Sequence, residues 1–259
     1  MDLELNGRTA LVLGSSQGLG HAVATVLAAE GAEVILTGRS AEKLTKAAAD
    51  LGATARPARS EVLDLADPAS VADLIARISK EQIDILVLNG GGPPPGPVAS
   101  VGSDVWNKQF AAMVTGPLAI ASAVLPGMRQ RGFGRIVAIV SSGVQQPIPN
   151  LGISNTLRSS IIGWAKTLAG EVAGEGVTVN AVVPGRIHTS RVDELDAAAA
   201  QRAGKTPEAV AEASRATIPM GRYGDPREFA DAVAFLASAR ASYITGTTLR
   251  VDGGMIRGI

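Results

Sequence analysis

The chain has 259 residues, of which 46% are hydrophobic, and it carries 24 Lys plus Arg against 24 Asp plus Glu, a net charge of zero. This length and composition suffice for one substantial core, and the balanced charge argues against nucleic acid or an anionic membrane surface as a partner. There is no Cys, and His21 and His188 are the two His residues, so disulfides and thiol nucleophiles are excluded and a metal site is not expected.

The N-terminal segment MDLELNGRTALVLG contains acidic residues and runs directly into the first predicted strand. It lacks the basic leader and the apolar core of a signal peptide. No apolar run reaches the length of a membrane-spanning helix. We therefore expect a cytoplasmic protein without a membrane partner.

Residues 9–39 predict a strand, a glycine-rich turn, a helix and a second strand. The stretch from Ala10 to Leu13 is a short apolar strand. Gly14, Gly18 and Gly20 follow it, where the chain must turn tightly and let phosphate oxygens approach the backbone. The N-terminus of the helix then offers free N–H groups to a pyrophosphate. The segment therefore predicts dinucleotide binding by the turn residues Gly14, Ser16, Gln17, Gly18, Leu19 and Gly20.

The end of the second strand indicates which dinucleotide is bound. An acidic side chain there would accept a hydrogen bond from a ribose 2′-hydroxyl and repel a 2′-phosphate. The residues present are Thr37, Gly38, Arg39 and Ser40, which supply a guanidinium and two hydroxyls but no carboxylate. This composition favours NADP(H) over NAD(H), with Arg39 on the phosphate. The alternative is that Arg39 is solvated beside Ser40, which suits the N-cap of a helix through Leu51.

Helix and strand patterns alternate along the rest of the chain. The further predicted helices are 40–51, one that starts at Pro68 with Asp67 as its N-cap, 103–115, 117–131, one that ends near 174, and 226–237. The further predicted strands are 53–59, 83–88, 136–140, 177–182 and 247–251. A proline-rich loop at 93–97 excludes helix there, and residues 184–222 form an excursion with short helices of its own.

Strands separated by helical crossovers predict an α/β fold. We expect a doubly wound parallel sheet of the Rossmann type, with helices on both faces, in a single domain over residues 1–259. In such a sheet ligands bind beyond the carboxyl ends of the strands. The residues at those ends are Gly14, Arg39, Asp64, Asn89, Ser141 and Pro184. They are predicted to line one crevice, over which the 184–222 excursion closes as a lid for the substrate.

Six motifs occur in order along the chain: LGSSQGLG, DL at 64–65, LNGGG at 88–92, GRIVAIVSS at 134–142, VNAVVPGRIHT at 179–189 and YITGTTLRVDGG at 243–254. Together they resemble the short-chain dehydrogenase/reductase family, and within it the 3-oxoacyl-ACP reductases. The resemblance also implies a homotetramer. The cofactor contacts that it implies are adenine contacts at Asp64 and Leu65, a structural turn at Asn89 and Gly90 with Gly91 beside it, and nicotinamide contacts from Pro184, Gly185, Ile187 and Thr189.

Typical members of this family carry an Asn, Ser, Tyr, Lys tetrad, in which Tyr is the general acid or base and Lys lowers its pKa. Alignment with that pattern places Ser141 at the Ser position and Met113 at the Asn position. The Tyr-x-x-x-Lys positions fall on Ser154 and Arg158, so the chain is an atypical member that lacks this motif. Both Tyr residues of the chain lie beyond residue 220 and are poor substitutes. Because a Ser hydroxyl is a far weaker acid than a phenol of pKa about 10, the usual proton donor is missing.

Ser154 and Arg158 remain catalytic candidates, because positions i and i+4 share one face of a helix and point into the crevice together. Arg158, also a cofactor candidate, can hold a ribose hydroxyl, a substrate carboxylate or a developing oxyanion, but it cannot pass a proton. The alternative is an ion bridge from Arg158 to an acid on a neighbouring helix. Ser141 is a donor aimed at the substrate carbonyl or, alternatively, a cap at the strand end. His188, near the nicotinamide loop, is a candidate proton donor, but we expect it to face solvent.

The sequence therefore predicts an NADP(H)-dependent oxidoreductase that acts on a small carbonyl or alcohol substrate, with Ser141 and Arg158 polarising the oxygen. The proton comes from water, from Ser154 or from the substrate. One alternative is a protein of this fold that binds the nucleotide without turnover, as a sensor or an assembly partner. Another, ranked last, is non-redox chemistry like that of the halohydrin dehalogenases, which share the fold and carry Arg in place of Lys.

Overall fold

The computed structural model describes residues 1–52 and 58–258. Within them, seven strands form one parallel sheet in the order β3-β2-β1-β4-β5-β6-β7. The strands are β1 (Thr9–Val12), β2 (Glu33–Gly38), β3 (Arg59–Val62), β4 (Ile85–Leu88), β5 (Gly134–Ile139), β6 (Val177–Pro184) and β7 (Thr248–Val251). Because all the strands are parallel, their carboxyl ends lie along one edge of the sheet. The strand order reverses between β1 and β4, next to the glycine turn.

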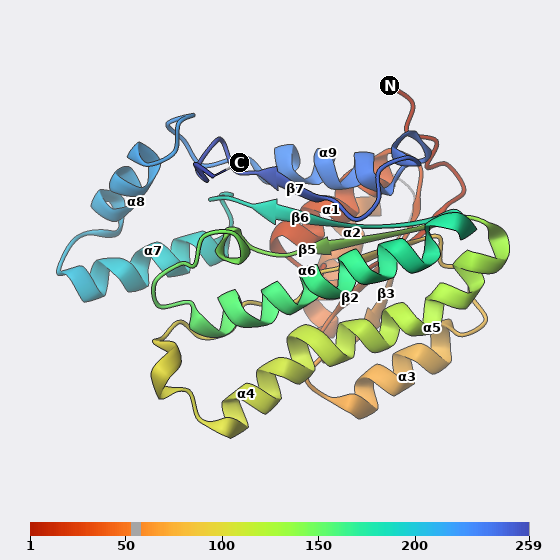
Figure 1. Cartoon of the computed structure of the whole chain (residues 1–259), viewed down its shortest axis with the longest axis horizontal. Coiled ribbons are helices and arrows are strands. Elements are labelled where there is room, and N and C mark those ends of the chain that lie inside the picture. Colours follow the sequence, from red (N-terminus) through yellow and green to blue (C-terminus); the bar gives the residue numbers. More distant parts are fainter. Residues whose placement is uncertain (53–57, 259) are drawn as a thin grey trace.

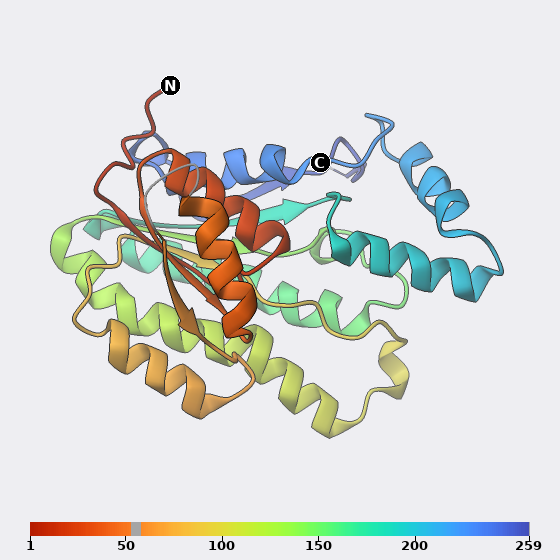
Figure 2. The same ribbon diagram turned by 180° about the vertical axis from the view of Figure 1, so that it is seen from behind.

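Helices cover both faces of the sheet (Figures 1 and 2). One layer contains α1 (Gly18–Ala29), α2 (Ala41–Gly52) and α9 (Pro226–Ala237); the other contains α3 (Pro68–Ile78), α4 (Ser103–Phe110), α5 (Gly116–Arg131) and α6 (Gly152–Val172). The remaining pair, α7 (Ser190–Ala203) and α8 (Pro207–Ala216), projects beyond the carboxyl ends of β5 and β6 (Figure 1). This pair occupies the 184–222 excursion, at the edge of the sheet where the lid is predicted.

Alternate side chains of each strand enter two separate cores, one under each helical layer. Leu11 and Leu13 pack with the apolar faces of α3, α5 and α6. Ala10 and Val12 pack with α1, α2 and α9, whose Phe229 is fully buried. The predicted doubly wound, single-domain α/β fold is confirmed.

The third strand differs from its prediction over 53–59. Residues 53–57 lie outside the described residues, and the strand observed is Arg59–Val62. It pairs with β2 so that Ile35 lies opposite Arg59 and Gly38 opposite Val62. Its position is set by this pairing rather than by its own apolar pattern, because three of its four side chains are exposed at the sheet edge.

The two helices predicted at 103–115 and 117–131 form one continuous helix. They are joined by a π-helical turn, Ala111–Thr115, instead of a break. The N–H that Pro117 lacks would have bonded to Met113 in an α-helix, and the wider turn accommodates that missing bond. The junction is tight, because a Cβ on Gly116 would lie 2.7 Å from the carbonyl oxygen of Leu65.

By length and composition alone, Ser103–Arg131 is the one helix among the described residues that could cross a membrane, whereas the sequence analysis expected none. In the fold, Met113, Ile120 and Met128 of this helix pack in the core against the sheet. The apolar composition thus serves the packing of a core helix.

Candidate functional site

The glycine turn is packed so closely that a side chain at Gly14 or Gly20 would collide with neighbouring backbone. Gly14 has φ 58°, and a Cβ there would lie 2.8 Å from the Asn89 carbonyl oxygen. A Cβ on Gly20 would collide with the Gly14 carbonyl oxygen, to which Asn89 Nδ2 donates a hydrogen bond of 3.0 Å. The amide of Asn89 thus ties the end of β4 to the turn after β1, across the point where the strand order reverses.

The N-terminus of α1 is open to a ligand. Its N-cap residue, Gln17, is extended and its side chain makes no capping hydrogen bond. Gly18 has φ 62°, and a Cβ there would meet no heavy atom of the described structure within 4 Å. The N–H groups of the first turn and the space beside them therefore fit a pyrophosphate.

Both hydroxyls at the end of β2 have structural partners, and the prediction that they suit a phosphate is wrong for Thr37. Thr37 is fully buried; its Oγ1 accepts from the N–H of Gly14 at 3.1 Å and donates to the Val12 carbonyl at 3.3 Å. Ser40 Oγ accepts from the N–H of Lys43 at 3.3 Å, so Ser40 is the N-cap of α2. Thr37 is therefore not free for a phosphate, whereas the Ser40 hydroxyl uses a lone pair in its capping bond and keeps its proton for donation.

Two cations border this strand end. Arg39 is exposed and has no hydrogen bond or ion pair with another described residue. Lys43, four residues later, donates from Nζ to Gln17 Oε1 of the glycine turn at 3.2 Å. A Cβ on Gly38 would lie 3.1 Å from Ser16 Oγ, so an acidic side chain would crowd this place. Lys43 was not predicted as a site residue, because Arg39 precedes the helix and no helical spacing links the two cations.

Asp64 and Leu65 lie just beyond β3, beside the end of β2. The N–H of Leu63 donates to the Gly38 carbonyl at 2.9 Å, which places the next residues next to the two cations. Asp64 Oδ1 accepts from the N–H of Ala66 at 3.0 Å. The adenine contacts of Asp64 and Leu65 stay a prediction.

Ser141 caps the short 3-10 helix Ser142–Val144 after β5, which is the alternative that the sequence left open. Its Oγ accepts from the N–H of Gly143 at 3.1 Å. This bond uses a lone pair, so the hydroxyl proton can still be donated. Asn155 on α6 holds the same loop with a pair of bonds to Ile148, Nδ2 to O at 2.9 Å and N to Oδ1 at 3.3 Å. The sequence analysis did not identify this clamp.

Arg158 lies across the ends of two strands. Its Nη1 donates to the Ile139 carbonyl of β5 at 2.9 Å, and its Nη2 donates to the Gly90 carbonyl after β4 at 3.3 Å. These partners are carbonyls, so the alternative of an ion bridge to a neighbouring helix is wrong. Burial, and then the charge of Arg191, lowers the pKa of Arg158 to about 10, which leaves it cationic at neutral pH.

Ser154, one turn before Arg158 on α6, is 7% exposed and has no side-chain hydrogen bond with another described residue. Met113 from the π turn and Arg158 line a small cavity of ≈ 20 Å³ under the strand ends. Helix α6 therefore holds Ser154 and Arg158, and its Asn155 holds the loop of Ser141, all at the carboxyl edge of the sheet.

The segment after β6 follows the same edge. The N–H of Gly185 donates to the Val251 carbonyl at 2.9 Å. Ile187 is 4% exposed and packs in the core, so it can offer a ligand its backbone but not its side chain. Thr189 is the N-cap residue of α7 and makes no side-chain capping bond, so its hydroxyl can meet a ligand.

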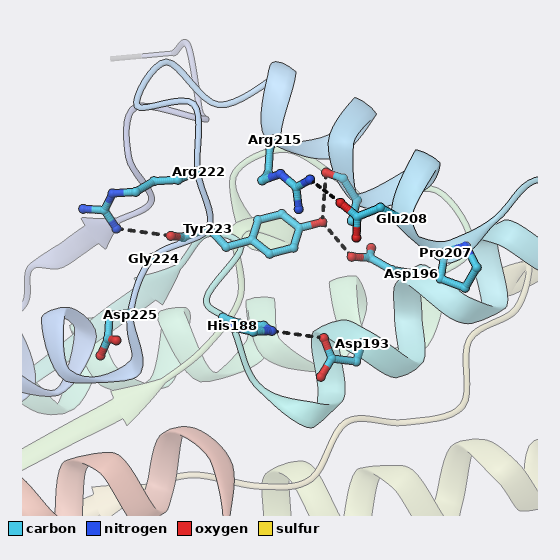
Figure 3. Close-up of a pocket in the computed structure, with 11 residues that line it drawn as sticks. His188, Asp193, Asp196, Pro207, Glu208, Arg215, Arg222, Tyr223, Gly224 and Asp225 are labelled. Atoms are coloured by element: carbon cyan, nitrogen blue, oxygen red, sulfur yellow. Dashed lines mark hydrogen bonds and ion pairs between the residues drawn. The ribbon is translucent and has the colours of Figure 1, made fainter.

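A larger cleft, of ≈ 460 Å³, lies between α7, α8 and residues 222–225 (Figure 3). Tyr223 donates to Asp196 Oδ2 at 2.6 Å, and burial together with this bond raises the pKa of the phenol. His188 lies in the same cleft; its side chain is 68% exposed, as expected, and pairs with Asp193 at 3.4 Å. Ser141, Ser154 and Arg158 do not line this cleft, so Tyr223 lies apart from the candidate catalytic residues.

Comparison with known proteins decides the family. Residues 14–256 match the family described as Enoyl-(Acyl carrier protein) reductase. The 3-oxoacyl-[acyl-carrier-protein] reductase FabG of Salmonella typhimurium is 38% identical over 257 residues, which cover 98% of this chain and 99% of that protein. The chain belongs to the short-chain dehydrogenase/reductase family. Family membership confirms the resemblance carried by the six motifs and makes the chain an oxidoreductase.

Solved structures of other short-chain dehydrogenase/reductases share the whole architecture. The L-sorbose reductase from Gluconobacter frateurii, complexed with NADPH and L-sorbose, has a TM-score of 0.92 at 30% identity, and the match covers 100% of both chains. YwfH, described as an NADPH dependent reductase involved in Bacilysin biosynthesis, has a TM-score of 0.90 at 28% identity and covers 97% of this chain and 99% of its own. The sheet, both helical layers and the α7–α8 pair are therefore features of the family fold.

Proposed function

We propose that this short-chain dehydrogenase/reductase uses NADP(H) to reduce the carbonyl group of a small molecule, or to oxidise the corresponding alcohol, in the cytoplasm. The observation that carries the proposal is that the open N-terminus of α1, Ser141 and Arg158 all lie at one edge of the sheet. The relatives support this chemistry, since FabG is a 3-oxoacyl reductase and the L-sorbose reductase is solved with NADPH.

Different residues at this edge would contact different parts of the cofactor. The glycine turn and α1 would hold the pyrophosphate, and Arg39 with Lys43 would hold the 2′-phosphate. The remaining contacts would come from Asp64 and Leu65 at the adenine, from the turn of Asn89, Gly90 and Gly91, from Arg158, and from Pro184, Gly185, Ile187 and Thr189 at the nicotinamide. When bound, the cofactor supplies or accepts the hydride.

Ser141 and Arg158 would stabilise the negative charge that develops on the substrate oxygen. The hydroxyl of Ser141 is oriented by the N–H of Gly143 and keeps its proton for donation. The guanidinium of Arg158 is fixed by its two carbonyl partners, so little reorganisation is needed when charge appears. Arg158 cannot release a proton at neutral pH, so the proton comes from water, from Ser154 or from the substrate itself.

A second candidate function is binding of the nucleotide without turnover. It is favoured by the absence of a phenol on α6, where Ser154 stands, and by the bond that holds Tyr223 to Asp196. Losing a positioned general acid commonly costs about 10² to 10⁴ in rate. Both functions use the same cofactor site, but only the first includes turnover of a carbonyl substrate.

The proposal is tested by NADPH oxidation in the presence of simple ketones. We expect weak turnover by the natural protein and a further loss of roughly 10²-fold or more in kcat on Arg158→Ala, because a principal oxyanion donor is removed. Arg129→Ala, at the exposed C-terminal end of α5 and at the opposite edge of the sheet, is the matched control and should keep the natural rate. Tight NADPH binding with no turnover would favour the second function. Robust turnover indifferent to Ser141, Ser154 and Arg158 would mean that the site lies elsewhere.

A further inference from the structure

Two guanidinium groups from different helices reach one loop, residues 89–93, after β4. Arg158 on α6 donates from Nη2 to the Gly90 carbonyl at 3.3 Å. Arg191, in the first turn of α7, donates from Nη2 to the Pro93 carbonyl at 2.8 Å. Because the two carbonyls are three residues apart, the cations lie at opposite ends of one short stretch of backbone.

The two glycines in the middle of this stretch make room for a ligand and for Arg191. A Cβ on Gly91 would meet no heavy atom of the described structure within 4 Å, so the space beside it is open. A Cβ on Gly92 would lie 3.0 Å from both Nε and Nη2 of Arg191. Glycine at 92 therefore lets the guanidinium lie against the backbone, and glycine at 91 leaves the neighbouring surface free.

One exposed carboxylate faces the two cations at this loop among the described residues. Both described partners of the Arg158 guanidinium are backbone carbonyls. Among the described residues, Arg191 has an ion pair with Glu194 at 3.2 Å, but that carboxylate belongs to the same helix and is 63% exposed. Arg191 is close enough to Arg158 to contribute to the lowering of its pKa. Two cations that repel each other at a partly buried place are stabilised by an anion shared between them.

We infer that the substrate carries an anionic group, a carboxylate or a phosphate, that binds between Arg158 and Arg191 beside Gly91. The inference rests on the proposed function and narrows it, since the carbonyl substrate becomes an oxo acid or an oxo phosphate instead of a neutral ketone. The planar fork of Arg matches both groups in bidentate geometry.

A purely structural role for Arg191 has a different signature. If its bond to Pro93 serves only to hold the lid, removing it weakens the binding of every substrate equally. If it recognises an anion, removing it weakens the binding of anionic ligands alone. The comparison between a charged ligand and its neutral analogue therefore separates the two roles.

The experiment measures binding by calorimetry, with and without saturating NADP⁺, for three probes: acetoacetate, its neutral methyl ester, and dihydroxyacetone phosphate. We expect at least one anionic probe to bind about tenfold more tightly than the ester, the size of one charge-assisted hydrogen bond. Arg191→Ala should remove that difference and leave the ester unchanged, whereas Arg191→Lys should retain part of it. Arg202→Ala is the matched control, because it removes the same charge from the same helix at an exposed position.

Preference for acetoacetate or for dihydroxyacetone phosphate identifies the anion. Equal losses for charged and neutral probes in Arg191→Ala, no binding of either anion, or natural protein that binds the ester as tightly as both anions would overturn the inference. A failure of the proposed function is distinguishable: anion preference without NADPH-dependent turnover leaves the anion site standing and removes the reductase. Turnover without anion preference leaves the reductase function standing and overturns the anion site.

Discussion

At the scale of single residues, the surroundings of a polar side chain decide whether it stays available for a ligand. Thr37 and Arg39 are two positions apart at the end of β2. Thr37 is fully buried and bonded to Val12 and Gly14, because leaving a buried hydroxyl without a partner costs about 1–3 kcal/mol. Arg39 is exposed and unpaired within the described residues, so it can meet an anion together with Lys43.

Arg39 and Lys43 together predict which nucleotide binds more tightly. NADPH should bind more tightly than NADH, and Arg39→Ala should weaken NADPH binding by roughly tenfold or more while leaving NADH unchanged, since charge-assisted bonds to the 2′-phosphate are lost. Lys43→Ala should produce a smaller loss in the same direction. Isothermal titration of both nucleotides measures these affinities.

Lys46→Ala is the control for Lys43→Ala, because Lys46 is an exposed cation on the same helix, three residues further on. It should leave both affinities unchanged. Equal affinities for the two nucleotides in the natural protein, or a preference for NADH that persists in Arg39→Ala, would contradict the assignment of the 2′-phosphate site.

At the scale of elements, α6 connects the parts of the candidate site. Asn155 holds the loop after β5, and Arg158 bonds to the ends of β4 and β5. Ile161 and Ala165 from the same helix are buried in the core against the sheet. A site carried by a packed helix holds its geometry more firmly than one carried by loops. Substitutions at Ser154 and Arg158 therefore test the chemistry of these side chains while the helix that carries them stays in place.

If Ser154 and Arg158 occupy the family's Tyr and Lys positions, the double substitution Ser154→Tyr with Arg158→Lys should raise the reduction of simple ketones. It places a phenol and a lysine one turn apart on α6, beside Ser141, and a positioned general acid is worth about 10²-fold or more. Steady-state NADPH oxidation measures the gain.

The two single substitutions are the controls, and neither should give the full gain, because the phenol needs the lysine to lower its pKa. Circular dichroism and thermal unfolding establish that the double variant folds, since Ser154 is buried. A folded double variant without higher activity would contradict the alignment or show that Met113 blocks the pocket.

At the scale of the whole molecule, large apolar side chains stay on the surface of the single chain. Tyr243 is fully exposed, and Met220 is 68% exposed. Exposed apolar groups of this size mark contact surfaces between proteins when they gather into patches. Tyr243 opens the C-terminal motif that the family resemblance places between subunits.

We therefore predict a homotetramer whose contacts include residues 243–259. Light scattering on the purified protein should give about four times the 26.3 kDa of the chain. Tyr243→Glu should shift the mass to a smaller species, because it places a charge in an apolar contact. Val62→Glu, a half-exposed position on edge strand β3, should leave the mass unchanged. A monomer at micromolar concentration would refute the prediction.

The sequence by itself determined the fold class and the order of the elements. The alternation of apolar strands with amphipathic helices, and caps such as Asp67 before Pro68, depend on residues close together in the chain. The glycine turn was predictable for the same reason, because Gly14, Gly18 and Gly20 each act on local backbone geometry. The spacing of the family motifs placed Ser154 and Arg158 at the Tyr and Lys positions, an assignment that stays a prediction.

Only the tertiary structure decided which partners the polar groups have. Arg158 bonds to Gly90, 68 residues away, and Arg191 bonds to Pro93, 98 residues away. No local pattern encodes either contact, since each depends on how α6 and α7 lie over the ends of the strands. No local pattern encodes the bonds of Thr37 either, because its hydroxyl finds its backbone partners only when β1 and the glycine turn lie beside β2. Side-chain types are local properties of the sequence, whereas the availability of a charged or polar group to a ligand depends on what packs around it.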